Sequence, residues 1–172
     1  VTGQWHKAAS LPTPRMQLAA VAVGDKVWAI GGNQAIGPSF ASVDIYDPAT
    51  NTWSEGPQLG TARSALAATV FNGSIYVLGG QDSRSQVKAV EVLAPFDQAW
   101  KVGPPLPEGI IRLGVAELDG QLHAIEGEHH FVLAPGADHW EMAAAPPTWR
   151  KGLGVATHEG KLYAVGGCRT VN

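Results

Sequence analysis

The densest group of potential metal ligands and proton-transfer groups lies between His123 and His130. This segment reads His-Ala-Ile-Glu-Gly-Glu-His-His, and imidazole and carboxylate groups together suit zinc and other divalent metals. On a strand, however, alternation separates His123 from Glu126, and the spacing matches no established metal signature. We therefore expect no metal and no cofactor, and interpret the segment as a polar hairpin tip beside one core histidine.

Arginine side chains form the second candidate group. Arg15, Arg63 and Arg150 each stand sixteen positions before a glycine, and Ile110 occupies the corresponding position in between, with Arg112 two residues later. The planar guanidinium fork suits carboxylates and phosphates. A residue that recurs in every repeat is often architectural, pairing with carboxylates or carbonyls, so Arg112, which is out of register, is the better binding candidate.

Motifs for nucleophilic or phosphate chemistry are absent from the sequence. It contains no Gly-x-Ser-x-Gly, no His-Glu-x-x-His and no phosphate-binding loop. The glycine pairs are expected at strand ends, where they do not cradle phosphate. We assign no catalytic residue, and expect a protein that is not an enzyme.

Length and composition limit the architecture that positions these side chains. The 172 residues suffice for one domain or one array of small repeats. With 21 glycines, 12 prolines and only 16% charged residues, the chain favours short strands joined by turns.

A net charge of −3 argues against nucleic-acid binding, and no apolar run reaches the ~20 residues of a membrane span. The single cysteine, Cys168, excludes an internal disulfide. No signal segment is visible, which favours an intracellular protein but leaves the compartment open.

An internal repeat organises the whole chain. Segments 27–32, 75–80 and 162–167 end in paired glycines, and segment 122–127 matches them with Glu126 replacing the first glycine. The first-glycine positions are separated by 48, 47 and 40 residues, and the tryptophans at 5, 53, 100 and 140 keep the same steps. Two markers in one register exclude chance. The shortening of the third repeat falls in one loop, between Gly127 and Phe131.

Each repeat is predicted to form four strands. An apolar strand is followed by a two-residue turn such as Asn72-Gly73 or Asp119-Gly120, which is a strong hairpin signal. The second strand ends at the glycine pair, the third alternates, and the fourth carries the tryptophan. Four short strands at a period near 47 are typical of a propeller blade. The predicted fold class is therefore all-β.

The order of these features resembles the Kelch repeat. The shared pattern is arginine, apolar strand, small turn, aromatic-apolar-Gly-Gly, a turn of the type Tyr46-Asp47-Pro48, then tryptophan and a proline-containing loop. The resemblance covers essentially the whole chain and implies a β-propeller of four-stranded antiparallel blades. The third repeat departs most, because His123 replaces an aromatic residue and Glu126 a glycine.

We expect one Kelch propeller or part-propeller of about three and a half to four blades. Blade 1 is predicted at about 15–58, blade 2 at 63–106, blade 3 at 112–146, and a partial blade at 150–172, with residues 1–11 as an additional fourth strand. Closure by two chains, with this N-terminal strand completing the partner's last blade, hides every exposed face. We favour such a homodimer; a four-bladed ring from one chain and a piece of a longer protein stay open.

Strand direction places the linkers and the loops after the second strands on one face of the propeller. The candidate ligand-binding residues on this face are Arg15, Gln17, Arg63, Ser64, Gln81, Arg112, Glu128, His129, Arg150 and Arg169. In Kelch proteins that bind acidic peptides, linker arginines carry much of the recognition. The resemblance thus implies a non-catalytic module that binds an acidic peptide or loop of a partner protein.

Two alternatives from other classes stay open. Some Kelch-type propellers act on sugars, such as sialic acid mutarotases, and here the arginines would hold a carboxylate sugar with Glu126 or His129 as acid or base. The chain could also be a ligand-free segment of a larger scaffold. The tryptophans at 5, 53, 100 and 140 are expected to pack between blades, whereas Trp149 lies outside the register, where a role as a binding anchor and burial in the linker are equally compatible with the sequence.

Overall fold

The structure, a computed structural model, describes residues 3–169, and its regular elements are all β-strands. We call its three four-stranded sheets blades 1 to 3, and its two-stranded sheet the C-terminal hairpin. Blade 1 consists of β1 (Ala19–Val23), β2 (Lys26–Ile30), β3 (Val43–Asp47) and β4 (Thr52–Glu55). Blade 2 consists of β5 (Ala67–Phe71), β6 (Ser74–Leu78), β7 (Val90–Leu93) and β8 (Lys101–Gly103). Blade 3 consists of β9 (Gly114–Leu118), β10 (Gln121–Glu126), β11 (His129–Leu133) and β12 (Glu141–Met142). The C-terminal hairpin consists of β13 (Lys151–His158) and β14 (Lys161–Cys168). No part of the chain within these residues forms a helix that could cross a membrane.

The tight turns predicted between the first two strands of each blade are present. In blade 2, Phe71 pairs with Ser74 across Asn72 and Gly73, whose φ angles are 47° and 74°. Two positive φ angles are what a hairpin turn of this length requires, because they match the twist of its strands. The shortened loop of blade 3 is equally tight, since Glu126 pairs directly with His129.

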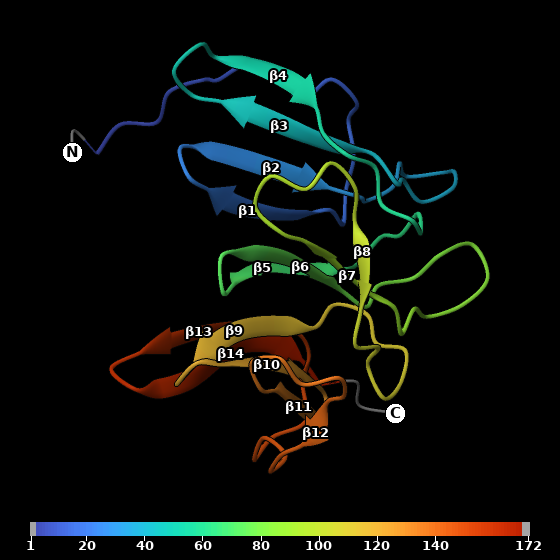
Figure 1. Cartoon of the computed structure of the whole chain (residues 1–172), viewed down its shortest axis with the longest axis vertical. Coiled ribbons are helices and arrows are strands. Elements are labelled where there is room, and N and C mark those ends of the chain that lie inside the picture. The colour runs from blue at the N-terminus through green and yellow to red at the C-terminus, as the bar shows by residue number, and fades with distance from the viewer. Residues whose placement is uncertain (1–2, 170–172) are drawn as a thin grey trace.

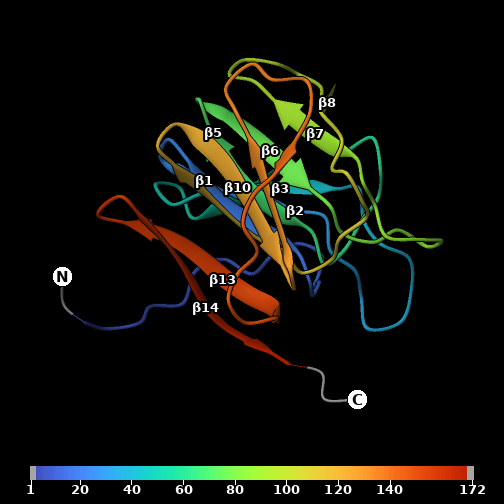
Figure 2. The same cartoon turned by 90° about the horizontal axis from the view of Figure 1, so that it is seen from below.

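The blades are arranged in succession, with their first strands adjacent to one another (Figures 1 and 2). One apolar cluster fills the space between blades 1 and 2, and a second fills the space between blades 2 and 3. Backbone bonds connect each blade to the next linker: the N–H groups of Gly32, Gly80 and Gly127 donate to the carbonyls of Arg63, Ile110 and Arg150. The all-β fold of antiparallel four-stranded blades is thus confirmed.

Glycine is required at the points where blades approach most closely. A Cβ atom on Gly79, whose φ is 60°, would lie 2.5 Å from the carbonyl oxygen of Ile110 in the next linker. The equivalent atom on Gly31 would lie 2.7 Å from the carbonyl oxygen of Arg63. Both the backbone conformation and the lack of space therefore exclude a side chain here.

The N-terminal segment differs from its prediction. Residues 3–11 form no strand, and Trp5 is completely exposed instead of packed between blades; residues 1–2 lie outside the described residues. The segment nevertheless keeps the register of the repeat. The Trp53 indole donates to the Ala9 carbonyl over 3.0 Å, as Trp100 and Trp140 do to Pro57 and Pro104. Trp5 lacks this environment because no described strand lies beside its segment.

A four-bladed ring closed within one chain is not observed. The sheet of the C-terminal hairpin contains only β13 and β14, and residues 3–11 contribute no third strand to it. In Figure 1 the N-terminal segment accompanies blade 1, at the end of the molecule away from the hairpin. The described residues therefore form an open row of three blades and one half-blade.

Candidate functional site

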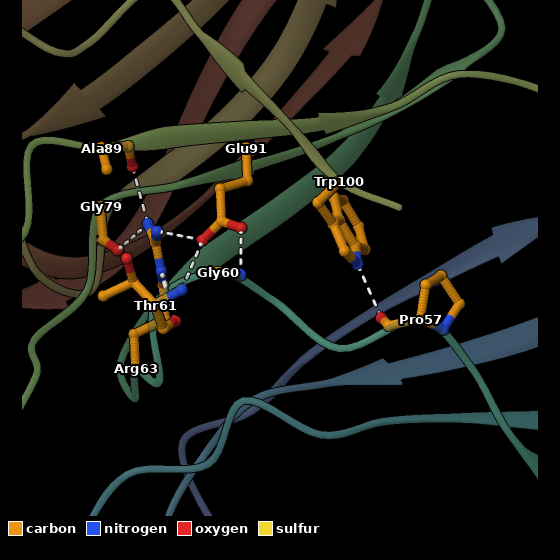
Figure 3. A network of polar contacts seen from close by, with 8 residues as sticks. All are labelled: Pro57, Gly60, Thr61, Arg63, Gly79, Ala89, Glu91 and Trp100. Atoms are coloured by element: carbon orange, nitrogen blue, oxygen red, sulfur yellow. Dashed lines mark hydrogen bonds and ion pairs between the residues drawn. The ribbon is translucent and has the colours of Figure 1, made fainter. Parts of the chain in front are cut away.

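Arg63 lies at the centre of a buried polar network (Figure 3). Its side chain is fully buried, and Nη2 lies 2.5 Å from Oε1 of Glu91. Nη1 donates to the carbonyls of Gly79 and Ala89, at 3.1 and 2.7 Å. Burial lowers the pKa of the Arg63 guanidinium, and the charge of Glu91 opposes that shift. Nε donates to the carbonyl of Thr61 over 3.3 Å, so the guanidinium is satisfied by blade 2 and by the linker that precedes it.

Glu91 extends this network to the linker that leads into blade 2. Its carboxylate accepts hydrogen bonds from the backbone N–H groups of Gly60 and Thr61, at 2.5 and 3.1 Å. The Glu91 side chain is 7% exposed. A single carboxylate therefore holds the arginine and two linker amides, which are charge-assisted bonds of the stronger kind.

Arg15 has the same partners one repeat earlier. Its Nη2 lies 2.5 Å from Asp44, and Nη1 donates to the carbonyls of Gly31 and Ser42, both at 3.2 Å. Its side chain is only 1% exposed. The expectation that Arg15 and Arg63 face a ligand is therefore corrected: both are held inside blades, and the architectural interpretation applies to them.

Blade 3 replaces this ion pair with apolar side chains. Ile110 stands at the arginine position, and Phe131 pairs with Ala124 on β10 as Glu91 pairs with Val77 on β6. Both Ile110 and Phe131 are buried in the same apolar cluster. The arginine and its carboxylate have thus been lost together.

Arg150 keeps only part of the pattern. Its Nη1 donates to the carbonyl of Gly166 over 3.1 Å, the counterpart of the bonds to Gly31 and Gly79. Arg150 is exposed, and no carboxylate among the described residues pairs with it. Arg150 is therefore accessible where Arg15 and Arg63 are not.

Arg112 belongs to a different set of equivalent positions, two residues after those of Arg15, Arg63 and Arg150. Gln17, Ala65, Arg112 and Gly152 all have positive φ angles, of 54°, 53°, 57° and 66°. Backbone bonds join them from blade to blade, from Ala65 N–H to Gln17 and from Arg112 N–H to Ala65. Such a conformation is unfavourable for residues other than glycine and is often found at functional sites. Arg112 is exposed, and its side chain passes Gly152.

Some of the remaining candidate ligand-binding residues are exposed, and others are buried or already contact another side chain. Ser64 is 1% exposed, and its backbone bridges to Gln81, which is half-buried. His129 is half-buried, and its Nδ1 lies 2.8 Å from Oε1 of Glu108. Glu128 and Arg169 are exposed. The structure therefore excludes Ser64 from ligand contact and occupies His129 with an acidic partner.

Glu126 is an unusual buried acid at the end of β10. It is 7% exposed, and its Oε1 has no hydrogen-bond partner among the described residues. Burial raises the pKa of Glu126, and the charge of Glu108 adds to that shift, whereas Lys151 and His129 oppose it. Glu108 was missed from the sequence, although the other three repeats have threonine at its position.

His123 is a core residue, paired with a second histidine. It is 8% exposed, and its Nδ1 lies 2.8 Å from Nε2 of His130, whose other ring nitrogen contacts the Ala144 carbonyl. Burial and the charge of His130 lower the pKa of His123. Within residues 3–169, no cluster of three or more acidic, histidine or cysteine side chains is arranged to hold a metal ion.

Trp149 is half-buried beside Gly127, with the Lys151 ammonium 5.3 Å from its ring.

Comparison with known proteins places this architecture in a family. A model of the Kelch-repeats domain named FKB95 matches residues 4–152. Kelch-like protein 35 of Mus musculus is 31% identical over 125 residues, covering 72% of this chain and 21% of the relative. An F-box/kelch-repeat protein of Arabidopsis thaliana is 31% identical over 98 residues, covering 56% of this chain and 26% of the relative. The chain thus spans about a quarter of the length of the curated relatives it matches.

A solved structure shares the fold over nearly the whole chain. The structure of YjhT superposes with a TM-score of 0.83 at 19% identity, covering 95% of this chain and 62% of the other. This likeness concerns the fold, whereas the family match rests on sequence over residues 4–152. The chain belongs to the Kelch-repeat family, and its blades are those of a Kelch β-propeller.

Proposed function

We propose that this chain is a non-catalytic binding module that recognises an acidic peptide or loop of a partner protein. The observation that carries the proposal is the position of Arg112, an exposed arginine on a backbone with φ of 57°. The Arg112 side chain lies beside Gly152, and Arg150 and Lys151, which precede Gly152, are also exposed. A cluster of cations on the linker face suits carboxylates.

The burial of Arg15 and Arg63 sharpens this proposal. Since these two guanidinium groups are satisfied by Asp44 and Glu91, recognition falls to arginines that the blades do not use. Guanidinium groups that are exposed and free of carboxylate partners can form bidentate bonds with an incoming carboxylate. Linker arginines have this role in the acidic-peptide-binding Kelch proteins that the sequence resembles.

The test is a binding assay with a fluorescein-labelled acidic peptide of alternating residues, Glu-Gly-Glu-Gly-Glu-Gly-Glu, followed by fluorescence anisotropy. We expect Arg112→Ala to weaken binding by about tenfold, as loss of one charge-assisted hydrogen bond does. Lys161→Ala is the control, because Lys161 is an exposed cation beside the β13–β14 turn, on the face opposite the linkers. Equal affinity of the Arg112 and Lys161 variants would contradict the assignment of the face.

A second candidate, a sugar-acting site, is favoured by one observation, the orphaned carboxyl of Glu126. A buried acid with a raised pKa beside a histidine suits proton transfer to a sugar ring. Thermal-shift assays with sialic acid and with neutral sugars distinguish the two candidates. Stabilisation by sialic acid that Glu126→Gln abolishes would favour the sugar-acting site, whereas the binding-module proposal expects no shift.

A further inference from the structure

Phe96 occupies a turn position that glycine holds in the next blade. Residues 94–97 form a turn in which the backbone N–H of the fourth residue donates to the carbonyl of the first over 3.1 Å. Residues 134–137 form the same turn with the same bond in blade 3, and Gly136 stands there in the position of Phe96. The φ angles are 69° for Phe96 and 74° for Gly136. A turn of this type requires a positive φ at its third residue, which glycine adopts freely and a bulky residue does not.

Packing within the chain does not compensate for this backbone strain. The Phe96 side chain is 98% exposed, so it contributes nothing to the apolar clusters between the blades. Residues other than glycine that are held in the left-handed region are concentrated at functional sites, where the strain serves a contact. An exposed aromatic side chain on a strained turn therefore indicates a contact with another molecule.

An apolar groove lies beside Phe96, between blades 1 and 2. Both of these blades have four strands, so the groove does not depend on strands outside the described residues. Its volume of about 250 Å³ lies below the ~300–1,000 Å³ typical of small-molecule pockets, which favours a side chain of a peptide as the occupant. The apolar lining includes Val23, Trp28, Ile75, Leu93, Pro95 and Phe96.

The groove lies on the face opposite the linkers, and this face is acidic. In Figure 1 the β1–β2, β5–β6 and β13–β14 turns mark it on the left of the molecule. We call it the turn face, and its residues are 24–25, 47–52, 72–73, 94–100, 119–120, 134–140 and 159–160. These residues include six carboxylates and no lysine or arginine. The charge of the turn face therefore favours a basic partner.

Two of these carboxylates adjoin the groove. Asp25 lies in the turn that joins the strands of Val23 and Trp28, and Asp97 lines the groove itself. Asp97 already pairs with Lys101 over 2.9 Å, but ion pairs at a surface are weak, so its carboxylate can accept a second cation. An apolar side chain in the groove would thus have acidic groups on either side of it.

We infer that the groove beside Phe96 docks an extended segment of a partner protein, in which an apolar side chain stands between lysine or arginine residues. The apolar side chain would lie against Trp28 and Phe96, and its cationic neighbours would approach Asp25 and Asp97. A buried aromatic anchor of this kind is typical of the residues that dominate binding at protein interfaces. The inference goes beyond the proposed function, because it concerns the opposite face of the blades and a partner of opposite charge.

A second copy of this chain fits the groove less well. Insertion of each Phe96 into the groove of the other copy would be self-complementary in shape, as a two-fold interface requires. Such a dimer would, however, bring together two turn faces that each have six carboxylates, and like charges placed opposite one another disfavour a contact. A basic partner avoids this repulsion.

The test uses the peptide Gly-Lys-Gly-Leu-Gly-Lys-Gly and two altered peptides, one with serine in place of leucine and one with glutamate in place of both lysines. Binding is followed by amide chemical shifts of the full chain at low ionic strength, where surface charges are least screened. We expect shifts at Gly73 and at residues 93–97, which border the groove. The serine peptide should bind about tenfold more weakly, and the glutamate peptide more weakly still.

The variant Phe96→Gly separates recognition from folding. Since glycine adopts the φ of this turn without strain, the thermal midpoint should stay unchanged or rise, whereas binding of the leucine peptide should weaken about tenfold. Ile36→Gly is the matched control, because Ile36 is 93% exposed but lies in the loop between β2 and β3, on the linker face. It should leave binding of the peptide unchanged.

Several outcomes would overturn the inference. These are no binding, equal affinity for any two of the three peptides, shifts away from the groove, unchanged binding in Phe96→Gly, or a fall in the thermal midpoint of that variant. The comparison of peptides on the unaltered chain decides the question even if Phe96→Gly fails to fold. A dimer in sedimentation that Phe96→Gly abolishes would instead assign the groove to a second copy. Because Arg112→Ala and an acidic peptide test the proposed function separately, failure of one proposal leaves the other standing.

Discussion

Blade 2 and the C-terminal hairpin each have an arginine at the same position of the repeat, but the two arginines lie in opposite environments. Arg63 and Arg150 each donate to a glycine carbonyl sixteen residues later, over 3.1 Å in both cases. Arg63 is nevertheless fully buried with Glu91, whereas Arg150 is exposed and without a carboxylate among the described residues. The difference arises from the third strand, which blade 2 has and the hairpin lacks. The role of a repeated arginine is thus decided by the strand that faces it.

Blade 3 has a third arrangement at this repeat position, without an arginine. Ile110 and Phe131 replace the arginine and the carboxylate, and both are buried. Apolar residues of suitable volume can replace a buried ion pair with little loss, but removal of one partner leaves an uncompensated charge. The blade therefore tolerates either pair, and the members of a pair must change together.

The largest expected effect comes from removing the carboxylate of blade 2. Glu91→Ala leaves the buried Arg63 and two linker amides without their acceptor. We expect the free energy of unfolding to fall by about 3–5 kcal/mol, measured by urea denaturation. Glu117→Ala, on the exposed side of β9, is the control and should change stability by less than about 0.5 kcal/mol. Similar losses in the two variants would contradict the architectural role of Glu91.

The double variant Arg63→Ile with Glu91→Phe introduces into blade 2 the apolar pair that blade 3 has at these positions, Ile110 and Phe131. Each single change leaves a buried group unpaired, so their sum should exceed the loss in the double variant. We expect a coupling energy of about 1–3 kcal/mol from a double-mutant cycle in urea. Simple additivity would show that the two blades do not share interchangeable pairs.

The indole bonds between blades provide a smaller effect. Trp100→Phe removes the bond to Pro57 between two complete blades, and should lower the free energy of unfolding by about 1 kcal/mol. Trp53→Phe removes the bond to Ala9, which belongs to a segment without a strand partner. We expect Trp53→Phe to cost less than Trp100→Phe in thermal denaturation, and the reverse order would mean that residues 3–11 are held more firmly than the structure indicates.

The smallest effect concerns the pH dependence of blade 3. Burial and the charge of His130 lower the pKa of His123 in the folded protein. As the pH falls, His123 therefore becomes protonated in the unfolded chain near pH 6.5, and in the folded protein only at a lower pH. His123 therefore contributes a loss of stability as the pH falls below about 6.5, by less than about 1.4 kcal/mol per pH unit. His123→Tyr, which introduces the residue of blade 2, should reduce the difference in urea midpoint between pH 7.5 and 5.5. An unchanged difference would mean that His123 does not titrate differently on folding.

The repeat itself made most of the fold predictable. Paired glycines and tryptophans in one register located the blades, and Asn72-Gly73 located a turn, because these residues act through local backbone geometry. The packing of Trp5 was not predictable, since it depends on strands absent from the described residues. The roles of Arg15 and Arg63 depended on Asp44 and Glu91, whose signal was a carboxylate at equivalent positions of the third strands. The burial of Glu126 and its proximity to Glu108 arise from tertiary packing alone.

The central claim is that equivalent arginines are buried where a third strand supplies a carboxylate and accessible where it does not. Hydrogen exchange of the arginine Nε–H groups, followed by ¹⁵N NMR, tests it directly. We predict slow exchange for Arg15 and Arg63, and exchange for Arg150 as fast as for the exposed Arg84. Exchange of Arg150 as slow as that of Arg63, or of Arg63 as fast as that of Arg84, would contradict the claim.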